Sequence, residues 1–180
     1  AAVHSTGRSR DASWDAMKRR ETYGTSGHRI LLWFNLLQDD SSVPMGSAVA
    51  QNSNPRFRAK VIGSFKQLSG CPDYVVDTLE AKHLEKMSLG ECYNPSDERY
   101  LIERIEVIKI RPQAFNGENV TQLIEDSWRS FDCEPLPEGC TVEFEDPDFA
   151  AEGRDALYYI RALEEPVATI NGDNLRTTFD

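Results

Sequence analysis

The stretch MKRRETYGTSGHRILLWFNLL, residues 17–37, contains the change of pattern that decides the fold. A helical segment ends in a run of cations, two glycines interrupt the chain, and a strongly apolar run follows. Upstream, residues 1–3 predict the end of a short strand, and residues 9–20 predict a helix with Ser9 as its N-cap. Asp11 in the first turn and the cations in the last turn complement the helix dipole. This order is typical of the last unit of an α/β domain, so we expect the helix to pack on a larger body.

Beyond the two glycines the chain predicts strands. One segment, PRFRAKVIGSF, alternates apolar and polar side chains as far as Phe65, which predicts a half-buried strand. Other segments are apolar on both faces, as central strands are. The predicted strands are residues 29–37, 55–65, 101–110, 140–145 and 156–165. Because Pro, Gly, Asn and Asp clusters separate them, we predict a mainly β chain, α+β overall, built around an antiparallel β-sandwich.

Two segments fit more than one structure. Residues 77–87 place leucines and a methionine at loose helical spacing, which suits a short helix. Residues 119–131 also have apolar residues at helical spacing, but their aromatic and β-branched residues suit a strand. We favour extended or irregular structure for the second segment.

The composition excludes two classes of partner. The 180-residue chain has a formal net charge of −10 and a pI of about 4.8, so it repels nucleic-acid phosphates and anionic membranes. Its longest apolar run, ILLWF, is far shorter than the roughly 20 residues of a membrane-spanning helix. We therefore expect neither a nucleic-acid partner nor a membrane span.

The four cysteines, Cys71, Cys92, Cys133 and Cys140, form no CxxC pair, so their spacing is poor for a structural zinc site. Pairing by proximity predicts the disulfides Cys71–Cys92 and Cys133–Cys140. Such bonds form in oxidising compartments. The alternative is four buried free thiols in a cytosolic protein.

Among the three histidines, His4 is the candidate functional residue. It follows the short strand at the start of the chain, the place where α/β barrels put catalytic groups. The alternative is a loop histidine without such a role. His28, before a strand, and His83, in the predicted helix, are interpreted as structural or solvent-facing. No HxH or HExxH spacing occurs, so we expect no metal site built from this chain alone.

Carboxylates cluster in EFEDPDF, which contains Glu145, Asp146 and Asp148. Clustered oxygens can bind Ca²⁺, but this run lacks the spacing of an EF-hand loop. We interpret it as a solvated acidic loop whose proline ends a strand.

The first thirty residues resemble the closing unit of the PHP-type (polymerase and histidinol phosphatase) metal-dependent hydrolases, in particular a large uncharacterised bacterial family related to them. In that family a strand leads into a helix, turn and strand with the pattern R-[ED]-A-[IL]-W-D-A-L-x-R-R-E-x-Y-A-T-S-G-x-R-I. The matching residues are Arg10, Asp11, Trp14, Asp15, Ala16, Arg19, Arg20, Glu21, Tyr23, Thr25, Ser26, Gly27, Arg29 and Ile30. Gly24 replaces the usual alanine. Later segments also resemble that family, although Ser127 stands where many relatives have Pro or Ala.

The resemblance implies that residues 1–29 are the C-terminal remnant of a hydrolase barrel and that residues 30–180 form a β-sandwich-like domain. The metal-binding His and Asp clusters of such proteins lie upstream, so the divalent metal is expected in the intact protein and no cofactor in this chain. His4, Arg8 and Arg10 are then the candidates to reach the active-site face. The partner is the upstream barrel of the same polypeptide. The resemblance also implies an exported protein, in the periplasm or outside the cell.

On these grounds we expect an accessory β-domain that is not catalytic by itself. Two other functions remain open. A ligand- or carbohydrate-binding sandwich would use exposed aromatics as stacking platforms, with Trp33, Trp128, Tyr158 and Tyr159 as candidates. A self-contained hydrolase would use His4 and nearby carboxylates.

Overall fold

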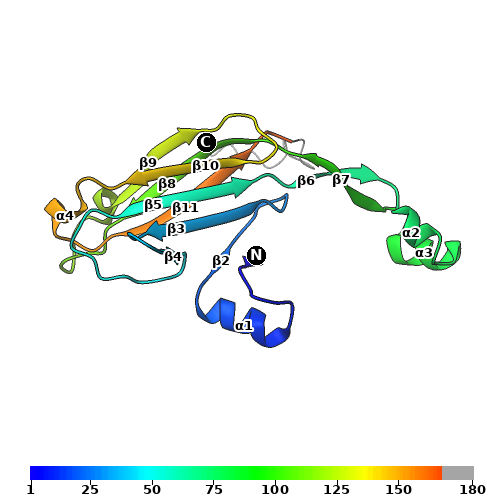
Figure 1. Cartoon of the computed structure of the whole chain (residues 1–180), viewed down its shortest axis with the longest axis horizontal. Helices are drawn as coiled ribbons and strands as arrows, with labels where there is room; N and C mark the ends of the chain where they lie inside the picture. The colour runs from blue at the N-terminus through cyan, green and yellow to red at the C-terminus, as the bar shows by residue number, and fades with distance from the viewer. Residues whose placement is uncertain (168–180) are drawn as a thin grey trace, which may run out of the picture.

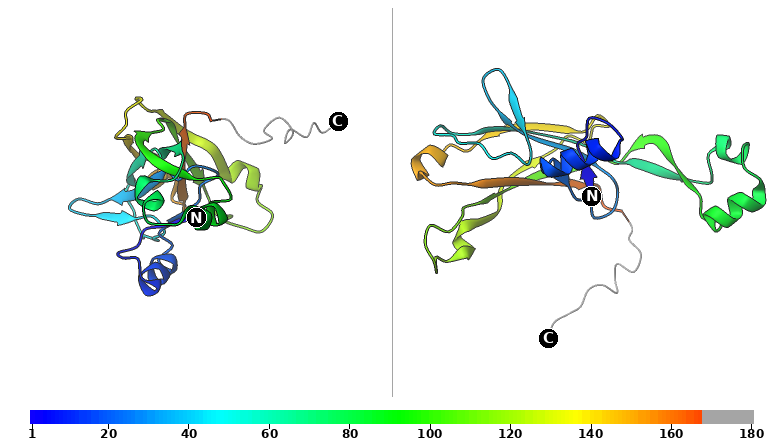
Figure 2. Two further views of the ribbon diagram at one scale, coloured as in Figure 1. Left: turned by 90° about the vertical axis from the view of Figure 1, so that its right-hand side faces the viewer. Right: turned by 90° about the horizontal axis from the view of Figure 1, so that it is seen from below.

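The computed structural model describes residues 1–167 and shows a mainly β chain (Figure 1). Two antiparallel sheets form a sandwich, a two-stranded arm projects from one end of it, and a short N-terminal segment lies beside it (Figures 1 and 2).

The first sheet has the strand order β10-β5-β3-β4, all antiparallel. Its strands are β3 (Leu31–Leu37), β4 (Ser42–Pro44), β5 (Arg56–Ile62) and β10 (Cys140–Glu145). Strand β5 shows strict alternation, because Phe57, Ala59 and Val61 are buried while the arginines and lysine between them are exposed. The period-two prediction is therefore confirmed over this strand.

The second sheet has the order β11-β8-β9. Its strands are β8 (Ile102–Ile110), β9 (Ile124–Asp132) and β11 (Leu157–Glu164). The strand predicted from its apolar faces, β8, lies between the other two, and Ile105, Val107 and Ile108 on it are fully buried. A short 3₁₀ helix, η1 (Val120–Leu123), precedes β9, and helix α4 (Phe149–Glu152) follows β10.

The core lies between the two sheets. Phe34, Phe57 and Phe144 stack there with ring centroids 5.3–6.2 Å apart, and aliphatic side chains of β5 and β8 surround them. At one side of the sandwich the disulfide Cys133–Cys140 joins the residue after β9 to the first residue of β10. One covalent bond thus ties the two sheets together.

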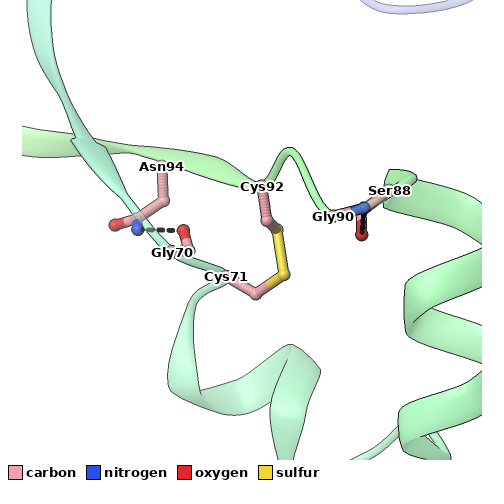
Figure 3. Close-up of a disulfide and its surroundings, with 6 residues drawn as sticks. All are labelled: Gly70, Cys71, Ser88, Gly90, Cys92 and Asn94. Atoms are coloured by element: carbon pink, nitrogen blue, oxygen red, sulfur yellow. Dashed lines mark hydrogen bonds between the residues drawn. A yellow bond between two sulfur atoms is a disulfide. The ribbon is translucent and has the colours of Figure 1, made fainter.

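The arm consists of β6 (Phe65–Ser69) and β7 (Tyr93–Arg99), with helices α2 (Asp73–Val76) and α3 (Ala81–Ser88) at its tip. The disulfide Cys71–Cys92 closes the tip (Figure 3). Beside it, Asn94 Nδ2 donates to the Gly70 carbonyl at 2.8 Å. Neither tip helix has a buried residue, so the tip is held by covalent and backbone bonds rather than by a core.

The arm leaves and rejoins the sandwich at one point. Ser64 O accepts from Tyr100 N at 2.9 Å, and Arg99 Nη1 donates to the Gly63 carbonyl at 2.6 Å. A Cβ at Gly63 would lie 1.8 Å from the Tyr100 carbonyl oxygen, so only glycine allows this approach. The single strand predicted over residues 55–65 was therefore wrong at its end: it stops at Ile62, and Phe65 is exposed on the arm.

The N-terminal segment contains β1 (Ala2–Val3), α1 (Arg10–Lys18) and β2 (Thr22–Tyr23). Ser9 is the N-cap of α1, as predicted, because its Oγ accepts from Ala12 N at 3.2 Å. Strands β1 and β2 pair antiparallel. Successive strands of an α/β barrel run parallel, so this pairing is not that of two neighbouring barrel strands.

Both ambiguous segments now have a structure. Residues 77–87 contain most of helix α3, and residues 119–131 form η1 followed by strand β9, which confirms the extended interpretation. All five predicted strands are present. The short strands β2 and β4 and the arm strands β6 and β7 were missed.

Prediction for the disulfides. Replacing Cys71 and Cys92 by serine should unfold the tip helices and leave the sandwich intact, because the tip shares no buried residue with the core of the sandwich. Replacing Cys133 and Cys140 by serine should instead cost the sandwich about 2–3 kcal/mol, since a short loop between the sheets is released. Residue-resolved hydrogen exchange shows whether the tip helices or the sandwich lose protection, and urea denaturation measures the change in the free energy of unfolding. Equal loss of protection in β3 and β8 for both variants would contradict the separation.

Candidate functional site

His4 lies at the edge of the first sheet. Its Nε2 is 2.7 Å from the Leu32 carbonyl, which can only accept, so Nε2 carries the proton of this bond. The imidazole also packs against Tyr23 and Trp33, with ring centroids 5.5 and 5.7 Å apart. The half-buried histidine therefore attaches the N-terminal segment to β3.

The two candidate arginines point to solvent. Arg8 lies in the loop after His4, Arg10 begins α1, and both are exposed. Within residues 1–167 neither forms an ion pair or a side-chain hydrogen bond. The structure thus places the three predicted residues in one segment but does not bring their side chains together.

Helix α1 presents an apolar surface beside these cations. Ala16 is its one buried residue, whereas Trp14 is 56% exposed and Met17 is 45% exposed. The Lys18 ammonium lies 5.6 Å from the centre of the Trp14 ring. The tryptophan and the methionine are three positions apart, so they lie on one exposed face of the helix.

The remaining aromatic candidates are mostly unsuited to stacking on a ligand. Trp128 and Tyr158 pack against the core, so the expectation that they are exposed was wrong. Trp33 is half-buried between His4 and Lys60, and Tyr159 is the exposed member of the set. His28 stacks on Tyr100, and His83 is exposed on the arm.

The most concentrated polar chemistry is a buried network that the sequence did not reveal. The Lys109 ammonium, 1% exposed, lies 2.6 Å from Asp146 Oδ2 and 2.9 Å from Glu152 Oε2. The Tyr158 hydroxyl donates to Asp146 Oδ2 at 2.5 Å, and Arg111 pairs with Glu152 at 3.1 Å. Strands β8 and β11, helix α4 and the residue that follows β10 all contribute.

These contacts decide the charge states. Burial raises the pKa of the Asp146 carboxyl, but hydrogen bonds from Lys109 and Tyr158 outweigh it, and the pKa lies below its usual value. For Lys109, burial lowers the pKa, but the bonds to Asp146 and Glu152 raise it by more than burial lowers it. The pKa therefore lies above its usual value, and the ammonium keeps its charge. Burial and the bond to Asp146 raise the pKa of Tyr158, so the phenol stays protonated.

The solvated acidic loop predicted for residues 145–148 was therefore wrong at its centre. Asp146 is 0% exposed, whereas Glu145 and Asp148 on either side of it are exposed. The physical reason is the buried cation opposite: a lysine within the apolar run IEVIKI needs a carboxylate. That lysine was the signal in the sequence. With every member bonded, this network suits a structural role rather than proton transfer.

Among residues 1–167, no group of three His, Cys, Asp or Glu side chains lies close enough to hold a metal ion. None of the helices in this part of the chain is long and apolar enough to cross a membrane. Both disulfides are of the kind found in oxidising compartments.

Comparison with known proteins gives one match. A family described as a protein of unknown function (DUF3604) matches residues 1–63. This span runs from the N-terminal segment through β3, β4 and β5 and ends at Gly63, where the arm begins. No curated protein and no solved structure matches the chain.

Prediction for the buried pair. Lys109→Met should destabilise the protein by about 3–5 kcal/mol, because it leaves the Asp146 carboxylate buried without its cation. Combining it with Asp146→Asn should recover part of that loss, since the uncompensated charge is gone. Urea denaturation measures both, and Lys60→Met, at an exposed position, serves as the control with a change within about 0.5 kcal/mol. Strictly additive effects of the two substitutions would rule out the coupling.

Prediction for pH. The pKa values of Asp146 and Glu152 are lowered in the folded state, so their stabilisation is present above the unfolded values, near 4, and is lost as the pH falls through the folded ones. The free energy of unfolding should therefore fall on acidification, and Asp146→Asn should make the fall shallower. Asp148→Asn, which removes an exposed carboxylate of the same loop, is the matched control. Urea denaturation between about pH 3 and 7 provides the comparison, and equal slopes in all three proteins would exclude Asp146 as the titrating group.

Proposed function

We propose that this chain is the non-catalytic accessory domain of a metal-dependent hydrolase of the PHP type, and that it docks on the catalytic unit through helix α1. The observation that carries the proposal is the surface of α1, where Trp14 and Met17 are exposed and only Ala16 is buried. Because most of the apolar surface of this helix is not buried within its own domain, the helix is suited to pack against another domain. The family match supports treating this segment and strands β3, β4 and β5 as one unit, because it spans all of them.

The proposal gives roles to the three candidate residues. His4 holds the segment on the edge of β3 through its bond to Leu32. Arg8 and Arg10, exposed at the head of α1, face the docked unit and supply cations suited to an anionic substrate. The metal ligands then lie in the catalytic unit, and the metal-activated attack on a phosphoester takes place there.

The compartment is part of the same proposal. Two disulfides and an acidic surface support an exported protein, in the periplasm or outside the cell.

Prediction for docking. In this chain alone, replacing both Trp14 and Met17 by serine should change the free energy of unfolding by less than about 0.5 kcal/mol, because both side chains are already exposed. In a polypeptide that joins this chain to its hydrolase unit, the same change should lower the thermal stability and increase the hydrogen exchange of α1. Tyr74→Ser, at an exposed position on the arm, is the control. Unchanged α1 exchange in the joined protein would contradict docking through this helix.

The non-catalytic part of the proposal has its own test. The purified chain, supplied with Mn²⁺, Zn²⁺ or Mg²⁺, should bind no stoichiometric metal and should not hydrolyse p-nitrophenyl phosphate or bis-p-nitrophenyl phosphate. Turnover that is abolished by His4→Ala would instead identify a self-contained hydrolase.

A further inference from the structure

The two sheets of the sandwich differ in width. The first has four strands and the second has three. Strand β10 is linked to the end of β9 by Cys133–Cys140, β5 contacts β8, and β3 contacts β11. Three pairs of strands therefore face each other. Within residues 1–167, the fourth strand of the first sheet, β4, has no strand opposite it.

A groove of about 870 Å³ lies at this position. One wall is formed by residues 43–51, which are the end of β4 and the loop after it. The other is formed by residues 155–160, which lead into β11 and form its first half. Successive residues of a strand point to opposite faces of its sheet. A groove lined by an unbroken run of residues from one strand must therefore follow the edge of that strand.

The edge of β11 that lies along the groove has free hydrogen-bonding groups. Strand β11 pairs with β8 alone, and an antiparallel ladder on one side uses only half of the backbone N–H and C=O groups. In the described part of the chain, no hydrogen bond outside this ladder reaches the backbone of residues 157–163. A binding partner can therefore pair with the strand backbone directly.

The groove walls favour apolar side chains. Val43, Met45 and Val49 line one side, and Leu157 and Ile160 line the other. Val49 is 41% exposed and Leu157 is 55% exposed, so both are open to an occupant. Phe34 and Phe57 of the core form part of the floor.

The rim adds charge of both signs. Arg20 and Asp155 line the groove, and neither has an ion-pair partner within residues 1–167. A segment with one acidic and one basic side chain complements this rim. By contrast, a second copy of the chain, at net charge −10, is repelled overall.

We propose that this groove binds an extended polypeptide segment, which adds to the free edge of β11 as the fourth strand of the second sheet. Its backbone pairs with β11, its alternate apolar side chains enter the groove, and its terminal charges meet Arg20 and Asp155. The edge of β11 is eight residues long, enough for a strand of ordinary length. This inference does not depend on the accessory role proposed above.

The test uses the full chain and a nine-residue peptide of alternating valine and threonine, with glutamate at one end and lysine at the other. A second peptide has the two charges exchanged, so that both strand directions are sampled. We expect saturable binding of one of them and slower hydrogen exchange of the β11 amides. An added edge strand uses only one of its two alternating sets of amides, so each set is N-methylated in a separate peptide. Methylation of the set that faces β11 should weaken binding at least tenfold, because it removes backbone donors and keeps every side chain, whereas methylation of the other set should not.

Variants of the protein locate the site. Val49→Glu and Leu157→Lys place charges in the groove at exposed positions, so they should fold normally and weaken peptide binding at least tenfold. Leu68→Lys, 53% exposed on the arm, is the matched control and should bind like the parent protein. Thermal unfolding verifies that all three variants are folded.

Three results would overturn the inference. The first is no protection of β11 by either peptide. The second is that both N-methylated peptides bind like the parent peptide and that sodium decanoate displaces them with no protected β11 amide, which would indicate a groove for small apolar molecules. The third is concentration-dependent self-association that Leu157→Lys abolishes, which would make the occupant a second copy.

Discussion

The charge on Lys109 is the constraint around which much of the sandwich is arranged. This residue lies in the central strand of the second sheet, where neighbouring positions are fully buried isoleucine and valine. An ammonium in such a place is tolerated only when carboxylates and further hydrogen bonds surround it. Asp146 and Glu152 supply the carboxylates, and Tyr158 completes the bonding of Asp146. The end of β10, helix α4 and the start of β11 are thereby held in one place.

The fold is predictable from the sequence wherever burial follows a simple period. Strand β5 alternates, β3 and β8 are apolar on both faces, and the N-cap of α1 carries its usual serine. The arm is not predictable in this way. Strand β7 has the sequence YNPSDER, which is typical of turns, and it forms because it pairs with β6 next to a disulfide. Its pairing depends on a distant segment rather than on its own composition.

The candidate site was predicted less well than the fold. The position of His4 after a short strand was correct, but the bond that holds its ring is to a carbonyl 28 residues away, which no local pattern indicates. Asp146 was assigned to solvent because its neighbours are charged and a proline follows. Its burial depends on Lys109, 37 positions earlier in the chain. Spacing within a segment describes local structure, whereas ion pairs between strands depend on the register of the sheets.

The way the arm joins the sandwich also bears on how sequences of this kind can diverge. The chain leaves at Gly63 and returns at Tyr100, and these two points are in direct contact. The segment between them forms the arm, and none of its side chains belongs to the hydrophobic core of the sandwich. Lengthening, shortening or replacing the arm leaves the pairing of β5 and β8 with their neighbouring strands unchanged. Evolution can therefore vary the arm freely while the glycine at its root stays constrained, and the same junction is a natural place to graft a foreign loop.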